Sequence, residues 1–190
     1  MSNDFNYGNL RAADVVCTAA TSLAGRLIRL YTAKLKNRNG IREAGRQKIA
    51  NHCAIIIEMA SRLWLAEMVD DGLKIHSMKR YLNNKREKIV AIKRHKKLTL
   101  IRGQVNARII DLCQQTRDYD YAMILQYLKI GHDSEKNYYC SELCEVIANE
   151  FGATWDRYQL KRDAKRAMIA PVEIHFGAPE YSDFVTDFYV

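Results

Sequence analysis

No run of apolar residues in this sequence approaches the roughly 18 that a transmembrane helix needs. The opening segment, MSNDFNYGNLRAAD, is polar and lacks the apolar stretch of a secretory signal. The chain also has only two prolines, no internal repeat and no low-complexity tract, so no linker between domains is indicated. We therefore expect a single domain over residues 1–190. We expect it in the cytoplasm or, if a phage encodes it, in the virion or the host cell.

Metal-binding patterns of cysteine and histidine are absent too. The sequence has no Cys-x-x-Cys pair and no His-x-x-x-His pair, which are spacings typical of zinc sites, so we expect neither a metal nor another cofactor. The number of cysteines is odd, and without a secretory signal this favours reduced thiols over disulfides. The five are Cys17, Cys53, Cys113, Cys140 and Cys144.

Negative charge is the scarcer sign, with 22 Asp and Glu residues against 30 Lys and Arg residues and a formal net charge of +8. The excess gathers at 34–48, 79–97 and 161–166. Such runs either form a solvated face or bind an anionic partner such as nucleic acid or a lipid surface. No aromatic residues alternate with the lysines as base-stacking platforms would, which favours the solvated face.

Hydrophobic periodicity predicts an α+β chain. Short apolar or alternating segments between turn residues predict strands, and apolar residues at three- and four-residue spacing predict helices. The expected strands are 14–20, 52–59, 62–69, 73–77 and 88–94, with a last strand or extended segment at 168–176. The expected helices are 22–35, 104–117, 121–130 and about 138–151, with a basic loop at about 34–50. An antiparallel sheet thus precedes a largely helical part at about 101–152.

One cysteine lies where a helix is expected to begin. Cys140 opens the helix in the segment NYYCSELCEVIANEFG, so its thiol lies at the positive end of the helix dipole, which favours the reactive thiolate. A histidine brought to it across the sheet would act as a general base. Alternatively, Cys140 is the first buried member of an apolar stripe that continues through Leu143 and Ile147. The two interpretations are compatible, and the other four cysteines are expected in the core.

Four short motifs, in one order, resemble a known family. They are AADVVCTAATSLAGRLIR at 12–29, NHCAIII at 51–57, YDYAMIL at 119–125 and YYCSEL at 138–143. Together they are similar to the circularly permuted branch of the NlpC-type papain-like cysteine peptidases and amidases, the YiiX-like group. The resemblance implies a permuted papain-like fold, an antiparallel sheet packed against helices. Ala13 departs from the family, which commonly has glycine there, and Met68 departs where alanine is usual.

The resemblance also implies roles for particular residues. Cys140 would be the nucleophile and His52 the general base. The acidic position of the family falls on Glu67, which would orient the histidine. Tyr138, two residues before the cysteine, would help the backbone N–H of Cys140 to bind the oxyanion.

Strand geometry selects the same acid independently. Glu58 shares a face with His52, but six residues of strand, about 20 Å, separate the two. If 52–59 and 62–69 form a hairpin about Ala60 and Ser61, paired residue numbers sum to 121, and Glu67 lies diagonal to His52 on the same face. A loop of odd length would place Glu67 on the other face. We therefore predict a hydrogen bond between the Glu67 carboxylate and a ring nitrogen of His52.

These residues favour a thiol hydrolase that cleaves an amide or ester bond in a peptide, cell-wall or acyl-lipid substrate through an acyl-enzyme. The alternatives are a lipid acyltransferase and a non-catalytic module, on a papain-like scaffold, whose basic face binds nucleic acid or anionic lipid. The intact cysteine and histidine favour the enzyme, and the charge runs favour the module. The remaining histidines are expected at the surface or in loops: His76, His95, His132 and His175.

Overall fold

A computed structural model gives the fold, and it describes most of the sheet and the helices around it. The described residues are 9–20, 50–69, 71–79, 87–115, 140–155, 174 and 184–188. Several expectations lie outside them: the helices at 22–35 and 121–130, the basic loop, the run at 161–166 and Tyr138. Of the last expected strand, only Ile174 is described, and it is buried with a helical rather than an extended backbone.

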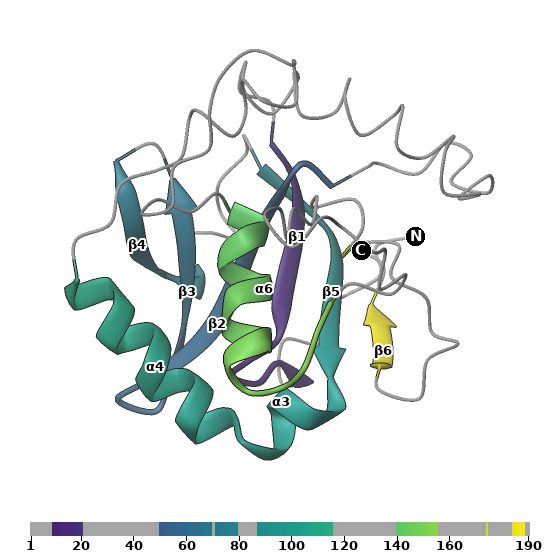
Figure 1. Ribbon diagram of the computed structural model, residues 1–190. Helices are drawn as coiled ribbons and strands as arrows, with labels where there is room; N and C mark the ends of the chain where they lie inside the picture. The colour runs from purple at the N-terminus through teal and green to yellow at the C-terminus, as the bar shows by residue number, and fades with distance from the viewer. Residues whose placement is uncertain are drawn as a thin grey trace, which may run out of the picture.

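The described chain forms an antiparallel sheet packed against helices, so the predicted α+β class is confirmed (Figure 1). The six strands lie in the order β4-β3-β2-β1-β5-β6. Their bounds are β1 Val15–Ala20, β2 His52–Met59, β3 Arg62–Val69, β4 Gly72–Ser77, β5 Glu87–His95 and β6 Phe184–Phe188. The described helices are α3 Lys96–Leu100, α4 Arg102–Gln114 and α6 Cys140–Glu150.

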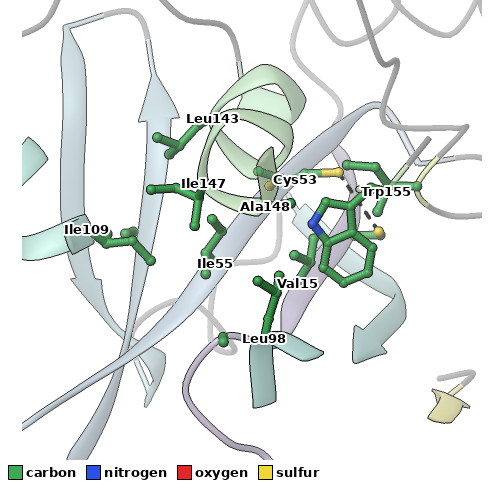
Figure 2. Close-up of a cluster of buried hydrophobic side chains, with 14 of the residues drawn as sticks. Val15, Cys53, Ile55, Leu98, Ile109, Leu143, Ile147, Ala148 and Trp155 are labelled. Carbon is green, nitrogen blue, oxygen red and sulfur yellow. Dashed lines mark hydrogen bonds between the residues drawn. The ribbon is translucent and has the colours of Figure 1, made fainter. Parts of the chain in front are cut away.

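The two faces of the central strand β2 bury different sets of side chains. Cys53, Ile55 and Ile57 pack in a cluster with α6, whereas Ala54 and Ile56 belong to a second cluster behind the sheet. This alternation is the period of two that strand geometry requires. Figure 2 shows the side chains of the first cluster between the sheet and α6. The unbroken apolar centre of β2 is therefore explained by burial on both faces, as expected from the sequence.

Helix α6 covers the middle of the sheet with the predicted apolar stripe. Its buried residues include Leu143, Cys144, Ile147 and Ala148, so the periodicity argument is confirmed for this helix. The helix ends before Gly152, whose φ of 64° is a left-handed conformation that glycine adopts without steric cost. The predicted stop at this glycine is therefore also confirmed.

The β2–β3 hairpin has the two-residue turn on which the position of Glu67 depends. Ala54 pairs with Glu67 and Met59 pairs with Arg62, so paired numbers sum to 121 as predicted. Ala60 and Ser61 have φ values of 50° and 57°. Positive φ at both central residues is the mark of a type I′ turn, whose twist matches that of the flanking strands.

The end of β5 differs from the sequence prediction. The basic run KRHKK at 93–97 was expected to be a solvated face, and His95 was expected at the surface. Instead, Lys93, Arg94 and His95 are only 1%, 9% and 3% exposed. The expectation was wrong for these three residues because other parts of the chain pack on the end of β5: Arg94 pairs with Asp14, and the His95 ring lies edge-on to the Trp155 ring at 5.5 Å. Only the last two lysines of the run, on α3, are exposed.

A buried ion pair accompanies this strand. Arg94 donates to both carboxylate oxygens of Asp14 at 2.7 Å from Nε and from Nη2, and it also donates to the backbone oxygen of Asn9. The neighbouring Ala13 has a φ of 73°, the left-handed region in which glycine is favoured.

Candidate active site

Cys140 is the first residue of α6, as the sequence predicts. After Cys140, the apolar stripe of α6 packs on the sheet and holds the helix in place. The Glu145 carboxylate adds to this, because it accepts hydrogen bonds from the Thr154 hydroxyl and, at 2.7 Å, from the Trp155 backbone N–H. At the last residue of α6, the Glu150 carboxylate accepts two hydrogen bonds from Arg108 of α4. The thiol of Cys140 is thereby held at the positive end of a fixed helix, where a thiolate is favoured.

His52 is the first residue of β2, and this strand begins at the same end of the sheet as α6 (Figure 1). Its ring interacts with the side chain of Cys140, so two residues 88 positions apart in sequence meet there. Cys140 is 1% exposed, and the side chain of His52 is 13% exposed. The thiol and the imidazole therefore interact where little water screens them.

The predicted hydrogen bond between Glu67 and His52 is present. The Nε2 atom of His52 lies 2.6 Å from Oε2 of Glu67. An ionised carboxylate can only accept, so Nε2 carries the hydrogen and donates it. The opposite ring nitrogen, Nδ1, is then the one left for the thiol of Cys140. This arrangement fixes both the tautomer and the orientation of the imidazole.

The electrostatic surroundings of His52 favour its charged form. Burial lowers the pKa of His52, but the charge and hydrogen bond of Cys140, followed by those of Glu67, hold the pKa well above its ordinary value. The charged form of the His52 ring is therefore favoured by the two side chains that flank it, Cys140 and Glu67. A thiolate–imidazolium pair is the active form of cysteine nucleophiles.

The other cysteines have the surroundings of core residues. Cys17 and Cys53 are fully buried, with their sulfur atoms 3.9 Å apart. Burial raises the pKa of Cys53 and of Cys144 well above the ordinary value, and it raises the pKa of the half-buried Cys113 to about 11. These three thiols consequently stay protonated near neutral pH, and the sequence-based expectation that they are structural fits these surroundings.

One residue of the site was missed by the sequence analysis. His76 of β4 was expected to be a surface or loop residue, but its Nε2 lies 3.2 Å from Oε1 of Glu67. The signal was available, because β4 pairs Lys74 with Glu67 and therefore sets His76 diagonal to it on the same face. The diagonal rule that identified Glu67 from His52 applies equally to the next hairpin.

Two further properties concern metals and membranes. Among the described residues, no group of three or more His, Cys, Asp or Glu side chains is placed to hold a metal ion. Within the same part of the chain, none of the helices combines the length and the apolar character needed to traverse a bilayer.

Comparison with known proteins shows a distant structural similarity. No family model and no curated protein matches the sequence. Among solved structures, the chain is similar to one described as "metalloprotein yiiX from Escherichia coli O157:H7, DUF1105", with a TM-score of 0.45 and 14% sequence identity. The alignment covers 75% of this chain and 66% of that chain, so the present chain spans less than two thirds of its neighbour.

Proposed function

We propose that the protein is a thiol hydrolase of the permuted NlpC-type, YiiX-like group, with Cys140 as nucleophile, His52 as acid and base, and Glu67 as the residue that orients His52. The observation that carries the proposal is the chain of contacts from the start of α6 to β3. The Cys140 thiol meets the His52 ring, and the ring donates to Glu67 at 2.6 Å. Such a nucleophile–base–acid series is the arrangement of covalent catalysis.

The reaction that this geometry supports begins with attack of the Cys140 thiolate on a carbonyl carbon, which forms a C–S bond and a tetrahedral oxyanion. The backbone N–H of Cys140 at the helix start is a donor for that oxyanion, and the family resemblance adds the hydroxyl of Tyr138. The imidazolium of His52 then protonates the departing amine or alkoxide as its bond to carbon breaks. A thioester on Cys140 remains.

Hydrolysis of the thioester uses the same residues in reverse. Neutral His52 takes a proton from water, the resulting hydroxide attacks the thioester carbon, and the C–S bond breaks to release a carboxylic acid and restore the thiolate–imidazolium pair. Glu67 keeps its contact with the ring and stabilises the charged form of His52, as the acid of a catalytic triad does. Peptide, cell-wall peptide and acyl-lipid substrates all contain the required carbonyl. If a lipid alcohol or amine replaced water, the same intermediate would give acyl transfer.

The test uses p-nitrophenyl acetate, an activated ester that thiolates attack without a specificity pocket. We expect acetylation of Cys140, detected by mass spectrometry of the digested protein, together with release of p-nitrophenolate. Cys140→Ala should lose both signals, and Cys113→Ala, the matched control on α4, should keep both. Acetylation of another cysteine instead, or equal p-nitrophenolate release by Cys140→Ala, would overturn the proposed function.

A further inference from the structure

The Glu67 carboxylate is buried between two histidines on neighbouring strands. Its side chain is 6% exposed, and its two oxygens have different partners: Oε2 accepts from His52 of β2, and Oε1 lies 3.2 Å from Nε2 of His76 of β4. A buried carboxylate is costly unless both oxygens receive hydrogen bonds. His76 is the residue placed to supply the second of these two donors.

The charged groups around Glu67 come from both strands that flank it. On β2 the facing group is His52. On β4 they are His76 and Lys74, and Lys74 is the direct cross-strand partner of Glu67. The ammonium group of Lys74, however, pairs with Asp71 at 3.2 Å, and the Lys74 side chain is 43% exposed. His76, rather than the nearer lysine, is therefore the β4 residue that contacts the carboxylate.

Exposure is greatest at the His76 end of this chain of contacts. The side chains of His52 and Glu67 are 13% and 6% exposed, whereas the side chain of His76 is 29% exposed. His76 thus lies between the buried carboxylate, which it contacts, and solvent, to which it is partly exposed. Nothing in the core packing requires an imidazole there, because the apolar residues of β4, Leu73 and Ile75, point to the opposite face of the sheet.

We infer that His76 is a positioning residue of this site, which donates a hydrogen bond to Oε1 of Glu67 and thereby holds the other oxygen on His52. The inference rests on the proposed function of Cys140, His52 and Glu67 and extends it by one residue. With both oxygens bonded, the plane of the carboxylate is fixed, so Oε2 stays aligned with the Nε2–H bond of His52. Without the donor, the terminal torsion of Glu67, which is broad in glutamate, is free to turn.

The expected consequence is a weaker thiolate–imidazolium pair. A carboxylate that is out of line with His52 stabilises the imidazolium less, and the thiolate of Cys140 loses part of its counter-charge. Removing one hydrogen bond to a charged group at a partly exposed position should slow thiolate reactions by about 3- to 10-fold. The structure of the sheet should change little.

The test measures carboxamidomethylation of Cys140 by iodoacetamide between about pH 5 and pH 9, the range in which histidine and cysteine titrate. His76→Phe fills the space of the ring but has no hydrogen-bond donor, and His76→Ala removes both the ring and the donor. His76→Gln keeps an N–H donor without an imidazole. We expect the first two to slow labelling at about pH 6 by 3- to 10-fold and to shift the half-maximal rate upward by about half to one pH unit. His76→Gln should stay within about twofold of the unmodified chain.

Lys74→Ala is the matched control, because it removes a longer side chain from the same face of β4 without removing a contact to Glu67. It should leave the labelling profile unchanged. Equal profiles for His76→Phe, His76→Ala and the unmodified chain would overturn the inference and leave the proposed function standing, as would a His76→Gln profile as slow as that of His76→Phe. If the unmodified chain shows no selective labelling of Cys140, the proposed function itself fails and the inference falls with it.

Discussion

Replacing Glu67 by glutamine tests the electrostatic part of the site with the least change in shape. The amide keeps the size of the carboxylate, but it removes the negative charge from the acceptor that lies 2.6 Å from Nε2 of His52. The side chains of His52 and Glu67 are only 13% and 6% exposed, so solvent does little to replace the lost charge. A hydrogen bond to a charged group contributes about 1.5–3 kcal/mol. At about 1.36 kcal/mol for each factor of ten, the loss corresponds to roughly a 10- to 150-fold slower reaction of Cys140.

The assay is p-nitrophenyl acetate turnover at neutral pH, with iodoacetamide labelling of Cys140 as a second readout that needs no turnover. Glu58→Gln is the matched control, because Glu58 lies on the same strand and the same face as His52 but at the exposed far end. It should keep full activity. If Glu67→Gln retained full turnover and full thiol reactivity, the proposal that this carboxylate orients and charges His52 would be refuted.

Three other variants or conditions give separate tests. Cys140→Ala should abolish turnover and change the melting temperature by only a few degrees, because the apolar stripe from Leu143 onward still packs. The pKa of His52 is raised in the folded state. The charged histidine therefore stabilises the fold fully below the ordinary histidine pKa of about 6.5, and this contribution is lost as the pH rises through the pKa of the folded state. The melting-temperature difference between the unmodified chain and His52→Gln should consequently shrink from about pH 6 upward. Arg94→Glu should lower the free energy of unfolding, measured in urea, by at least about 3–5 kcal/mol, because it leaves the Asp14 carboxylate buried without its cation. Lys96→Glu, at an exposed position of the same run, should change it by less than about 0.5 kcal/mol.

Each of these expectations has a contradicting result. Cys140→Ala that keeps its activity but melts far lower would make Cys140 a core residue only. A stability difference for His52→Gln that grows with rising pH would mean that the histidine is not stabilised in its charged form. Equal effects of Arg94→Glu and Lys96→Glu on unfolding would show that the whole basic run is a solvated face.

The position of Glu67 beside His52 could be predicted because it depends on local geometry alone. A two-residue turn fixes the parity of the hairpin, and alternation along each strand then fixes the face. The same geometry places His76 beside Glu67 through the β3–β4 register, although its polar neighbours in the sequence indicated a surface or loop position.

The features that were missed depend on contacts between segments far apart in the chain. The end of β5 is buried because distant segments pack on it: Asp14, 80 residues earlier, supplies the charge that Arg94 needs, and Trp155 lies against the His95 ring. No local pattern in KRHKK indicates such a partner. The meeting of Cys140 and His52 is of the same kind, and only the resemblance to a known family, rather than periodicity, indicated it before the structure.

The most direct test of the account compares Cys140 with Cys113 in one labelling experiment. Cys113 is half-buried, whereas Cys140 is 1% exposed, so accessibility alone would make Cys113 the faster thiol. Burial raises the pKa of Cys113 to about 11, but Cys140 has the helix N-terminus and the His52 imidazolium beside it. With limiting iodoacetamide at about pH 6, followed by mass spectrometry of the digest, the account predicts that Cys140 is labelled first and that His52→Ala abolishes this preference. Labelling of Cys113 before Cys140, or a preference that survives in His52→Ala, would contradict it.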